Sequence, residues 1–177
     1  GHPGLTLEDN DTTVVAIGSG SKGVARSVLA THSFESGRHY WEFVVEHCAT
    51  GQTSSGTLYF GIAQEGLDLQ RPLCREKCIG WYDDKLTDFE RLLVEPIEIE
   101  EGTCTGDNNR VGIYLDLDLG DIRFYVDKVE VGRGELKKTD SGFGTFHPAV
   151  SLYADSTYKG SKIRLETKAQ PPSGILL

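Results

Sequence analysis

Short stretches in which apolar and polar residues alternate run through most of this chain, and no segment carries a long helical period. Trp41, Phe43 and Val45 fall on one face of an extended strand, while Glu42 and Glu46 fall on the other. Glycine supplies 21 of the 177 residues, and frequent glycine-rich turns favour short strands over long helices. The sequence therefore predicts an all-β sandwich or barrel built from short antiparallel strands.

The clearest hairpin is predicted between residues 111 and 126. Apolar residues occupy the odd-numbered positions of 111–117 and the even-numbered positions of 122–126, so that both sets can face one core across a turn. Asp116 and Asp118 are expected on the first strand, facing away from that core. Their spacing does not match a calcium-binding loop, and we interpret them as residues of a solvated sheet face or of a structural hydrogen bond.

Other strands are predicted at 12–17, 57–63, 149–153 and 162–166. The strand at 57–63 is almost entirely apolar, which indicates burial on both faces. The acidic segment 85–107 is expected to lie mostly at the surface, with one strand at 90–94.

The charge of the chain limits its partners. It has 18 basic and 27 acidic side chains, which gives a formal net charge of −9. Nucleic acids and anionic membranes attract clustered lysine and arginine, so neither is expected as a partner. No stretch approaches the roughly 18 apolar residues of a membrane span. A neutral or basic protein partner is compatible with this charge.

The cysteines Cys48, Cys74, Cys78 and Cys104 are too sparse for a disulfide-rich scaffold, and no apolar leader is visible. We therefore expect reduced thiols in a cytoplasmic protein. Cys74 and Cys78 are closely spaced, but a structural zinc site needs four ligands and the chain offers no second pair of this kind. No metal site is predicted.

Gly18, Gly20 and Gly23 match G-x-G-x-x-G after a predicted strand. A dinucleotide site would also need a crossover helix and an acidic residue ending the next strand, and residues 24–33 are too short for that crossover. No G-x-S-x-G motif marks a nucleophilic serine. The sequence thus predicts no catalytic residue and no cofactor. A small β-sandwich hydrolase or carbohydrate-binding domain is the alternative, and it would place titratable groups with shifted pKa values in a pocket.

Several of these stretches resemble, in order, the motifs of the SPRY (B30.2) family. Residues 36–46 resemble its G-x-H-Y-W-E-V strand, 110–125 its R-V-G hairpin and 146–152 its L-x-P-x-x-S-L strand. The remaining matches are 59–63 to F-G-V-A, 79–81 to the Gly-Trp that follows, and 6–15 to the first strand. The resemblance covers residues 5–168. Residues 1–4 are then a disordered start or an appended remnant, and 169–177 a tail or linker.

The resemblance implies a bent antiparallel β-sandwich of two sheets that acts as a non-catalytic protein-binding module. Members of the family recognise a peptide or a protein surface through loops at one end of the sandwich. Many belong to ubiquitin ligases, among them the tripartite-motif kind, or to large scaffolds. We therefore expect a recognition domain that is monomeric in isolation.

By the family's pattern, the binding face would use loop segments around 19–22, 67–71, 83–87 and 153–158. The candidate partner-binding residues are Ser19, Ser21, Lys22, Asp68, Leu69, Gln70, Arg71, Asp83, Asp84, Lys85, Tyr153, Asp155 and Tyr158. Tyr153 and Tyr158 are the candidate aromatic anchors. The aspartates would make the face acidic, which predicts a ligand carrying arginine or lysine.

Overall fold

The computed structural model describes residues 4–10, 12–18, 25–49, 58–73, 77–82, 85–88, 92–99, 106–153 and 159–177. One sheet contains the strands β1 (Leu5–Glu8), β2 (Thr13–Ala16), β12 (Lys162–Glu166), β4 (Arg38–His47), β8 (Arg110–Asp116), β9 (Asp121–Val126) and β10 (Val129–Glu135), in that order. The other contains β3 (Ala25–Leu29), β11 (Phe146–Tyr153), β5 (Leu58–Gln64), β6 (Cys78–Tyr82) and β7 (Lys85–Thr87), again in order.

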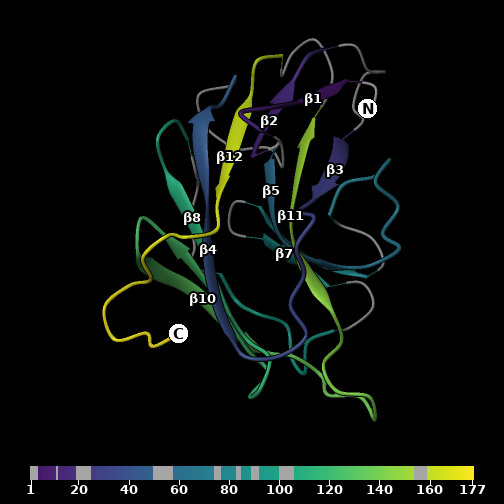
Figure 1. Cartoon of the computed structure of the whole chain (residues 1–177), viewed down its shortest axis with the longest axis vertical. Coiled ribbons are helices and arrows are strands. Elements are labelled where there is room, and N and C mark those ends of the chain that lie inside the picture. The colour runs from purple at the N-terminus through teal and green to yellow at the C-terminus, as the bar shows by residue number, and fades with distance from the viewer. Residues whose placement is uncertain are drawn as a thin grey trace.

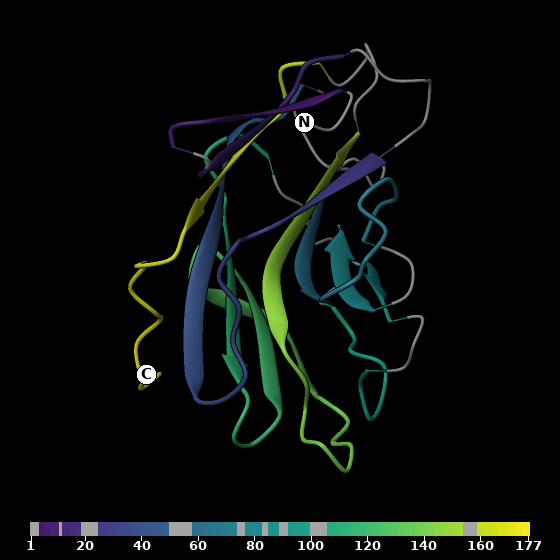
Figure 2. The same ribbon diagram turned by 45° about the vertical axis from the view of Figure 1, so that its right-hand side comes forward.

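The two sheets face each other as the layers of a sandwich, and every pair of neighbouring strands is antiparallel (Figures 1 and 2). The hairpin of β1 and β2 lies at one end of the sandwich, and the C-terminal segment lies beside the seven-stranded sheet (Figure 2). The predicted all-β, two-sheet architecture is confirmed. No helix in the described part of the chain could cross a membrane.

The alternation read from the sequence sets the inner faces of the sheets. Trp41, Phe43 and Val45 of β4 are buried in the main core, as predicted. Ile113 of β8 and Phe124 of β9 are fully buried and pair directly, which confirms the predicted hairpin. Aromatic and branched side chains from both sheets fill the space between them, and this burial is the main stabilising contribution.

The strand β5 is buried on both faces, as its composition predicted. Its outer face carries Tyr59 and Ala63, which pack with Leu67 and Leu73 of the following segment. Gly80 on the neighbouring strand β6 makes this approach possible, because a Cβ at position 80 would lie 2.0 Å from the carbonyl oxygen of Leu73. The chain after β5 thus folds back over its own sheet.

Two local predictions are wrong. The strand β8 ends at Asp116, and Asp118 lies in the turn beyond it, where its Oδ1 accepts a hydrogen bond from the backbone N–H of Gly37 at 2.9 Å. Asp116 itself is 1 % exposed and forms structural hydrogen bonds, which confirms one of the two interpretations offered for it. Its Oδ1 accepts the N–H groups of Asp118 and Leu119, both at 3.0 Å. The last residues of the predicted strand, 117 and 118, therefore belong to a tight turn instead.

The segment 85–107 lies mostly at the surface in its described part, as predicted, but the strand predicted at 90–94 does not form over residues 92–94. In its described part, Leu93 and Ile97 are buried, and residues 92–94 contribute only an isolated bridge rather than a strand. Ile97 packs against β10, where a Cβ on Gly134 would lie 2.4 Å from its Cγ1. The apolar residues between the glutamates therefore belong to the core, because a glycine-rich strand leaves room for them.

Candidate binding surface

The segment 67–71 lies over the outer side of the five-stranded sheet and is attached to β3 by its backbone. The N–H of Ser27 donates to the carbonyl oxygen of Leu69 at 3.1 Å. Nη1 of Arg26 donates to the carbonyl oxygen of Gln70 at 2.5 Å. The Ser27 hydroxyl donates to the carbonyl oxygen of Arg71. Three successive carbonyl groups are thus satisfied by one strand, which holds this loop against the sheet.

Asp68 shapes the turn within this segment. Its Oδ1 accepts the backbone N–H of Gln70 at 3.0 Å, and its carbonyl oxygen accepts the N–H of Arg71 at 3.1 Å. An aspartate that bonds the backbone two residues onward is a common way to stabilise a turn. The loop conformation is therefore defined both locally and by β3.

A buried chain of hydroxyl groups lies beneath the loop. Ser27 and Ser151 are both fully buried, and their Oγ atoms are 2.8 Å apart. The Ser27 hydroxyl donates to Arg71, so the Ser151 hydroxyl must donate to Ser27. Ser151 in turn accepts the N–H of Leu73 at 2.8 Å. Each hydroxyl donates once and accepts once, so two satisfied hydroxyl groups tie the C-terminal end of the loop to the sheet.

Leu69 and Tyr153 lie on this side of the molecule. Both are half-buried and pack against the same small cluster on the outer face of the sheet. Tyr153 is the last residue of β11, whereas Leu69 comes from the loop after β5. We call Asp68, Leu69, Gln70, Arg71 and Tyr153 the loop surface. These predicted binding residues are the ones that the structure brings together.

The charges of the loop surface are balanced. The Nε of Arg71 lies 3.1 Å from Oδ2 of Asp68, and both side chains are more than half exposed. An exposed pair of this kind contributes at most about 1 kcal/mol, so a partner can rearrange it at little cost. Lys85 lies in β7 and pairs with Tyr82 of β6. The other predicted residues lie outside the described residues: Ser19, Ser21, Lys22, Asp83, Asp84, Asp155 and Tyr158.

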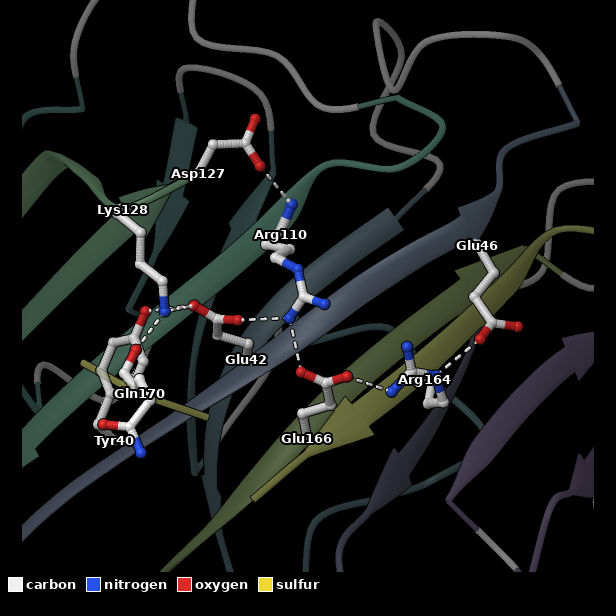
Figure 3. Close-up of polar contacts among 9 residues, drawn as sticks. All are labelled: Tyr40, Glu42, Glu46, Arg110, Asp127, Lys128, Arg164, Glu166 and Gln170. Atoms are coloured by element: carbon white, nitrogen blue, oxygen red, sulfur yellow. Dashed lines mark hydrogen bonds and ion pairs between the residues drawn. The ribbon is translucent and has the colours of Figure 1, made fainter. Parts of the chain in front are cut away.

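Sequence reasoning missed an ion-pair network on the outer face of the seven-stranded sheet (Figure 3). Its centre is Glu42, which is 1 % exposed. The carboxylate accepts hydrogen bonds from the hydroxyl of Tyr40 at 2.7 Å, from Nη1 of Arg110 at 2.8 Å and from Nζ of Lys128. Burial alone would raise the pKa of Glu42, but the hydrogen bonds from Lys128, Tyr40 and Arg110 outweigh it and lower that pKa.

The network continues across three strands. Arg110 also donates to Oε2 of Glu166 on β12 at 2.5 Å, and Nε of Arg164 donates to Oε1 of Glu46 on β4 at 2.7 Å. Hydrogen bonds from Arg110 and Arg164 lower the pKa of Glu166. The only signal in the sequence was the run of charged residues at outward-facing strand positions, which a solvated face would show equally well.

The C-terminal segment covers the neighbouring part of the same face. Tyr40, Tyr114 and Tyr125 form a cluster against which Ala169 and Ile175 pack. Nζ of Lys128 donates to the carbonyl oxygen of Gln170 and lies 5.0 Å from the centre of the Tyr40 ring (Figure 3). Residues 169–177, predicted as a tail or linker, therefore contact the sheet although they carry no strand. On this covered face, burial and the hydrogen bond to Glu42 raise the pKa of Tyr40, and hydrogen bonds to Glu166 and Glu42 raise the pKa of Arg110.

The comparisons with known proteins agree with this architecture. The family model of the SPRY domain matches residues 38–167. The chain belongs to the SPRY family. The resemblance read from the strands is thereby confirmed. SPRY domains bind protein or peptide ligands and are interaction modules rather than catalytic ones.

One curated relative of this SPRY domain is the E3 ubiquitin-protein ligase TRIM9 of Drosophila melanogaster, 29% identical over 151 residues. That alignment covers 84% of this chain but only 19% of TRIM9, so the chain spans about a fifth of the relative's length. The relative supports the expected resemblance to tripartite-motif proteins.

Solved SPRY structures show the same fold. The SPRY domain of human HERC1 superposes with a TM-score of 0.60 at 15% identity, covering 94% of each chain. The PSpry domain of TRIM65 gives a TM-score of 0.58 at 17% identity, covering 95% of this chain and 87% of that one.

Proposed function

We propose that this SPRY domain recognises a segment of a partner protein through the loop surface and serves as the substrate- or partner-recognition domain of a larger ubiquitin ligase or scaffold protein. The observation that carries this proposal is the attachment of the loop. Its carbonyl groups at positions 69–71 are bonded to β3, while Asp68 and Arg71 are exposed beside the half-buried Leu69 and Tyr153. A few anchors on a rigid loop are typical of protein recognition.

The partner segment is proposed to carry arginine or lysine. The chain has a net charge of −9, and Asp83, Asp84 and Asp155 lie in the predicted binding loops. Complementary charge mainly raises the rate of association and selects among partners. We further propose that the domain is monomeric in isolation and acts in the cytoplasm.

A peptide-library selection with the purified domain tests this function. Leu69→Ala and Tyr153→Ala should each weaken binding of a selected peptide about tenfold, because anchor residues in a small interface carry most of the binding energy. Leu119→Ala is the matched control, since Leu119 is an exposed leucine in the turn after β8. A selected peptide that binds all variants equally would place recognition elsewhere and contradict the loop surface.

Arg71→Ala tests the charge preference separately. Its loss frees the Asp68 carboxylate, so a basic peptide should bind severalfold more tightly at low salt. Arg133→Ala is the control, because Arg133 pairs with Glu130 at 3.0 Å in the same i,i+3 arrangement on β10. Equal affinities for the two variants would argue against a basic ligand at Asp68.

A further inference from the structure

Three tyrosines form an aromatic surface on the outer face of the seven-stranded sheet. We call Tyr40 of β4, Tyr114 of β8 and Tyr125 of β9 the tyrosine platform. The rings of Tyr40 and Tyr125 lie edge to face, with their centres 6.1 Å apart. All three side chains are buried, and Ala169 and Ile175 of the C-terminal segment pack against them. A segment that forms no strand thus covers an aromatic part of the sheet.

The sheet itself orients the tyrosine platform. Each of the three hydroxyl groups donates a hydrogen bond to a carboxylate on a strand of the same sheet. In the order of the tyrosines, the acceptors are Glu42 at 2.7 Å, Asp116 at 3.2 Å and Glu130 at 3.3 Å. None of these bonds involves the C-terminal segment, so the rings keep their orientation when the segment leaves. A surface that is ordered before binding takes up a ligand at a lower entropic cost.

Few polar contacts hold the C-terminal segment on the platform. Among the described residues, one hydrogen bond joins this segment to the sheet, and it runs from Nζ of Lys128 to the carbonyl oxygen of Gln170 (Figure 3). The apolar contacts come from Ala169 and Ile175. Because the partial burial of two aliphatic side chains stabilises a contact only modestly, a competing segment can displace this one.

Two prolines and a turn shape the segment. Pro171 and Pro172 are half-buried, and they bring no unpaired N–H group to the surface. The N–H of Ile175 donates to the carbonyl oxygen of Pro172 at 3.3 Å, and Gly174 between them has a φ of 89°. Glycine with a positive φ at the third position is typical of a type II turn. This turn brings Ile175 to the platform.

We propose that the tyrosine platform is a second binding surface, at which an uncharged partner segment of the pattern Pro-Pro-x-Gly-aliphatic replaces the C-terminal segment. Aromatic surfaces commonly bind proline-rich segments, because proline fixes the backbone before binding. Lys128 donates to a backbone carbonyl of the partner, as it does to that of Gln170. The loop surface lies on the other sheet, so this inference does not rest on the proposed function.

The C-terminal segment competes with such a partner within the same chain. Only residues 167–168 separate the end of β12 from Ala169. A segment on so short a tether has an effective concentration of the order of 1 mM. A partner therefore gains access to the platform when it binds more tightly than this segment does, or when the contacts of the segment are weakened.

NMR titration of the whole chain with a free peptide that has the sequence of residues 168–176 tests the proposal. The peptide should shift the signals of the tyrosine platform. Ile175→Asp in the chain should bind it at least about fivefold more tightly than the unmodified chain, because the competing segment is weakened. Leu176→Asp is the matched control and should leave the affinity unchanged, since Leu176 is 76 % exposed.

Changes in the peptide and in the platform test the contacts themselves, with the Ile175→Asp chain as the receptor. Alanine in place of the isoleucine of the peptide should weaken binding about tenfold, whereas alanine in place of its leucine should not. Tyr125→Ala should weaken binding at least as much. Tyr59→Ala, which removes a buried tyrosine from the other sheet, should not.

Three results would each overturn the proposal. The Ile175→Asp chain could bind the peptide no more tightly than the unmodified chain does. The two alanine variants of the peptide could bind equally well, a comparison that stands even where Tyr125→Ala does not fold. The peptide could shift signals of the loop surface and leave those of the tyrosine platform unchanged.

Discussion

The outer faces of the two sheets are both covered, but by different means. On the seven-stranded sheet, a buried carboxylate pairs with one cation from β8 and one from the turn between β9 and β10, and the C-terminal segment packs over three tyrosines. On the five-stranded sheet, the chain after β5 folds back and is tied down by two buried serines. The first face is held chiefly by ion pairs between side chains, and the second chiefly by hydrogen bonds to the backbone of the loop.

This difference separates a structural network from a recognition loop. The Glu42 carboxylate forms ion pairs with both Arg110 and Lys128, so these three charges already have partners within the domain. The loop over the five-stranded sheet uses its backbone for attachment, which leaves the side chains of Asp68 and Arg71 exposed. A loop that is held in place through its backbone and leaves its side chains exposed is suited to binding a partner.

The largest effect is expected on the seven-stranded sheet. Glu42→Gln should lower the free energy of unfolding by about 3 kcal/mol, because Lys128 and the buried Tyr40 hydroxyl lose their charged acceptor and Arg110 keeps only Glu166. The value lies at the low end of the usual range because Arg110 and Lys128 are about two-fifths exposed and can be hydrated. Urea unfolding measures the change, with Glu130→Gln as the control for an exposed ion pair.

The same variant tests how the stability of the fold depends on pH. The pKa of Glu42 is lower in the folded chain than its ordinary value of 4.5, so the unfolded state binds the proton first as the solution becomes acidic. Stability should be complete above pH 4.5 and fall as the pH drops below it. The fall should be shallower in Glu42→Gln. Equal slopes for the two proteins would show that this carboxylate is not stabilised by folding.

A smaller effect is expected beneath the loop. Ser151→Ala removes the acceptor of the Leu73 N–H and the donor to Ser27, and we expect a loss of about 2 kcal/mol. Amide hydrogen exchange at Leu73 should accelerate with it. Ser141→Ala, in an exposed turn, should change stability by less than about 0.5 kcal/mol. Unchanged exchange at Leu73 would mean that the hydroxyl chain does not hold the loop.

The smallest effect is expected in the C-terminal segment. Ile175→Ala removes a half-buried side chain from the tyrosine cluster and should cost about 1 kcal/mol. Leu176→Ala is the neighbouring control, because Leu176 is 76 % exposed. If thermal unfolding finds the two variants equally stable, the segment does not contribute to the cover of this face.

The sequence by itself determined the inner faces of the sheets. Alternation placed Trp41, Phe43 and Val45 on one side, and the order of the strand motifs was enough to indicate the SPRY family. It also indicated that β5 is buried on both faces. Period-two alternation reports which side of a strand a residue faces, and this is a local property of the backbone.

Only the tertiary structure decided what covers the outer faces. The two serines under the loop are 124 residues apart, and Lys128 is 86 residues from Glu42. Strand alternation marks Glu42 as outward-facing but cannot show that distant cations and the C-terminal segment will bury it. The same limit hid β10, whose glycines at positions 132 and 134 leave room for Ile97. Burial on an outer face depends on segments that come together only when the chain folds. The alternation of apolar and polar residues within one strand does not show which distant segments these are.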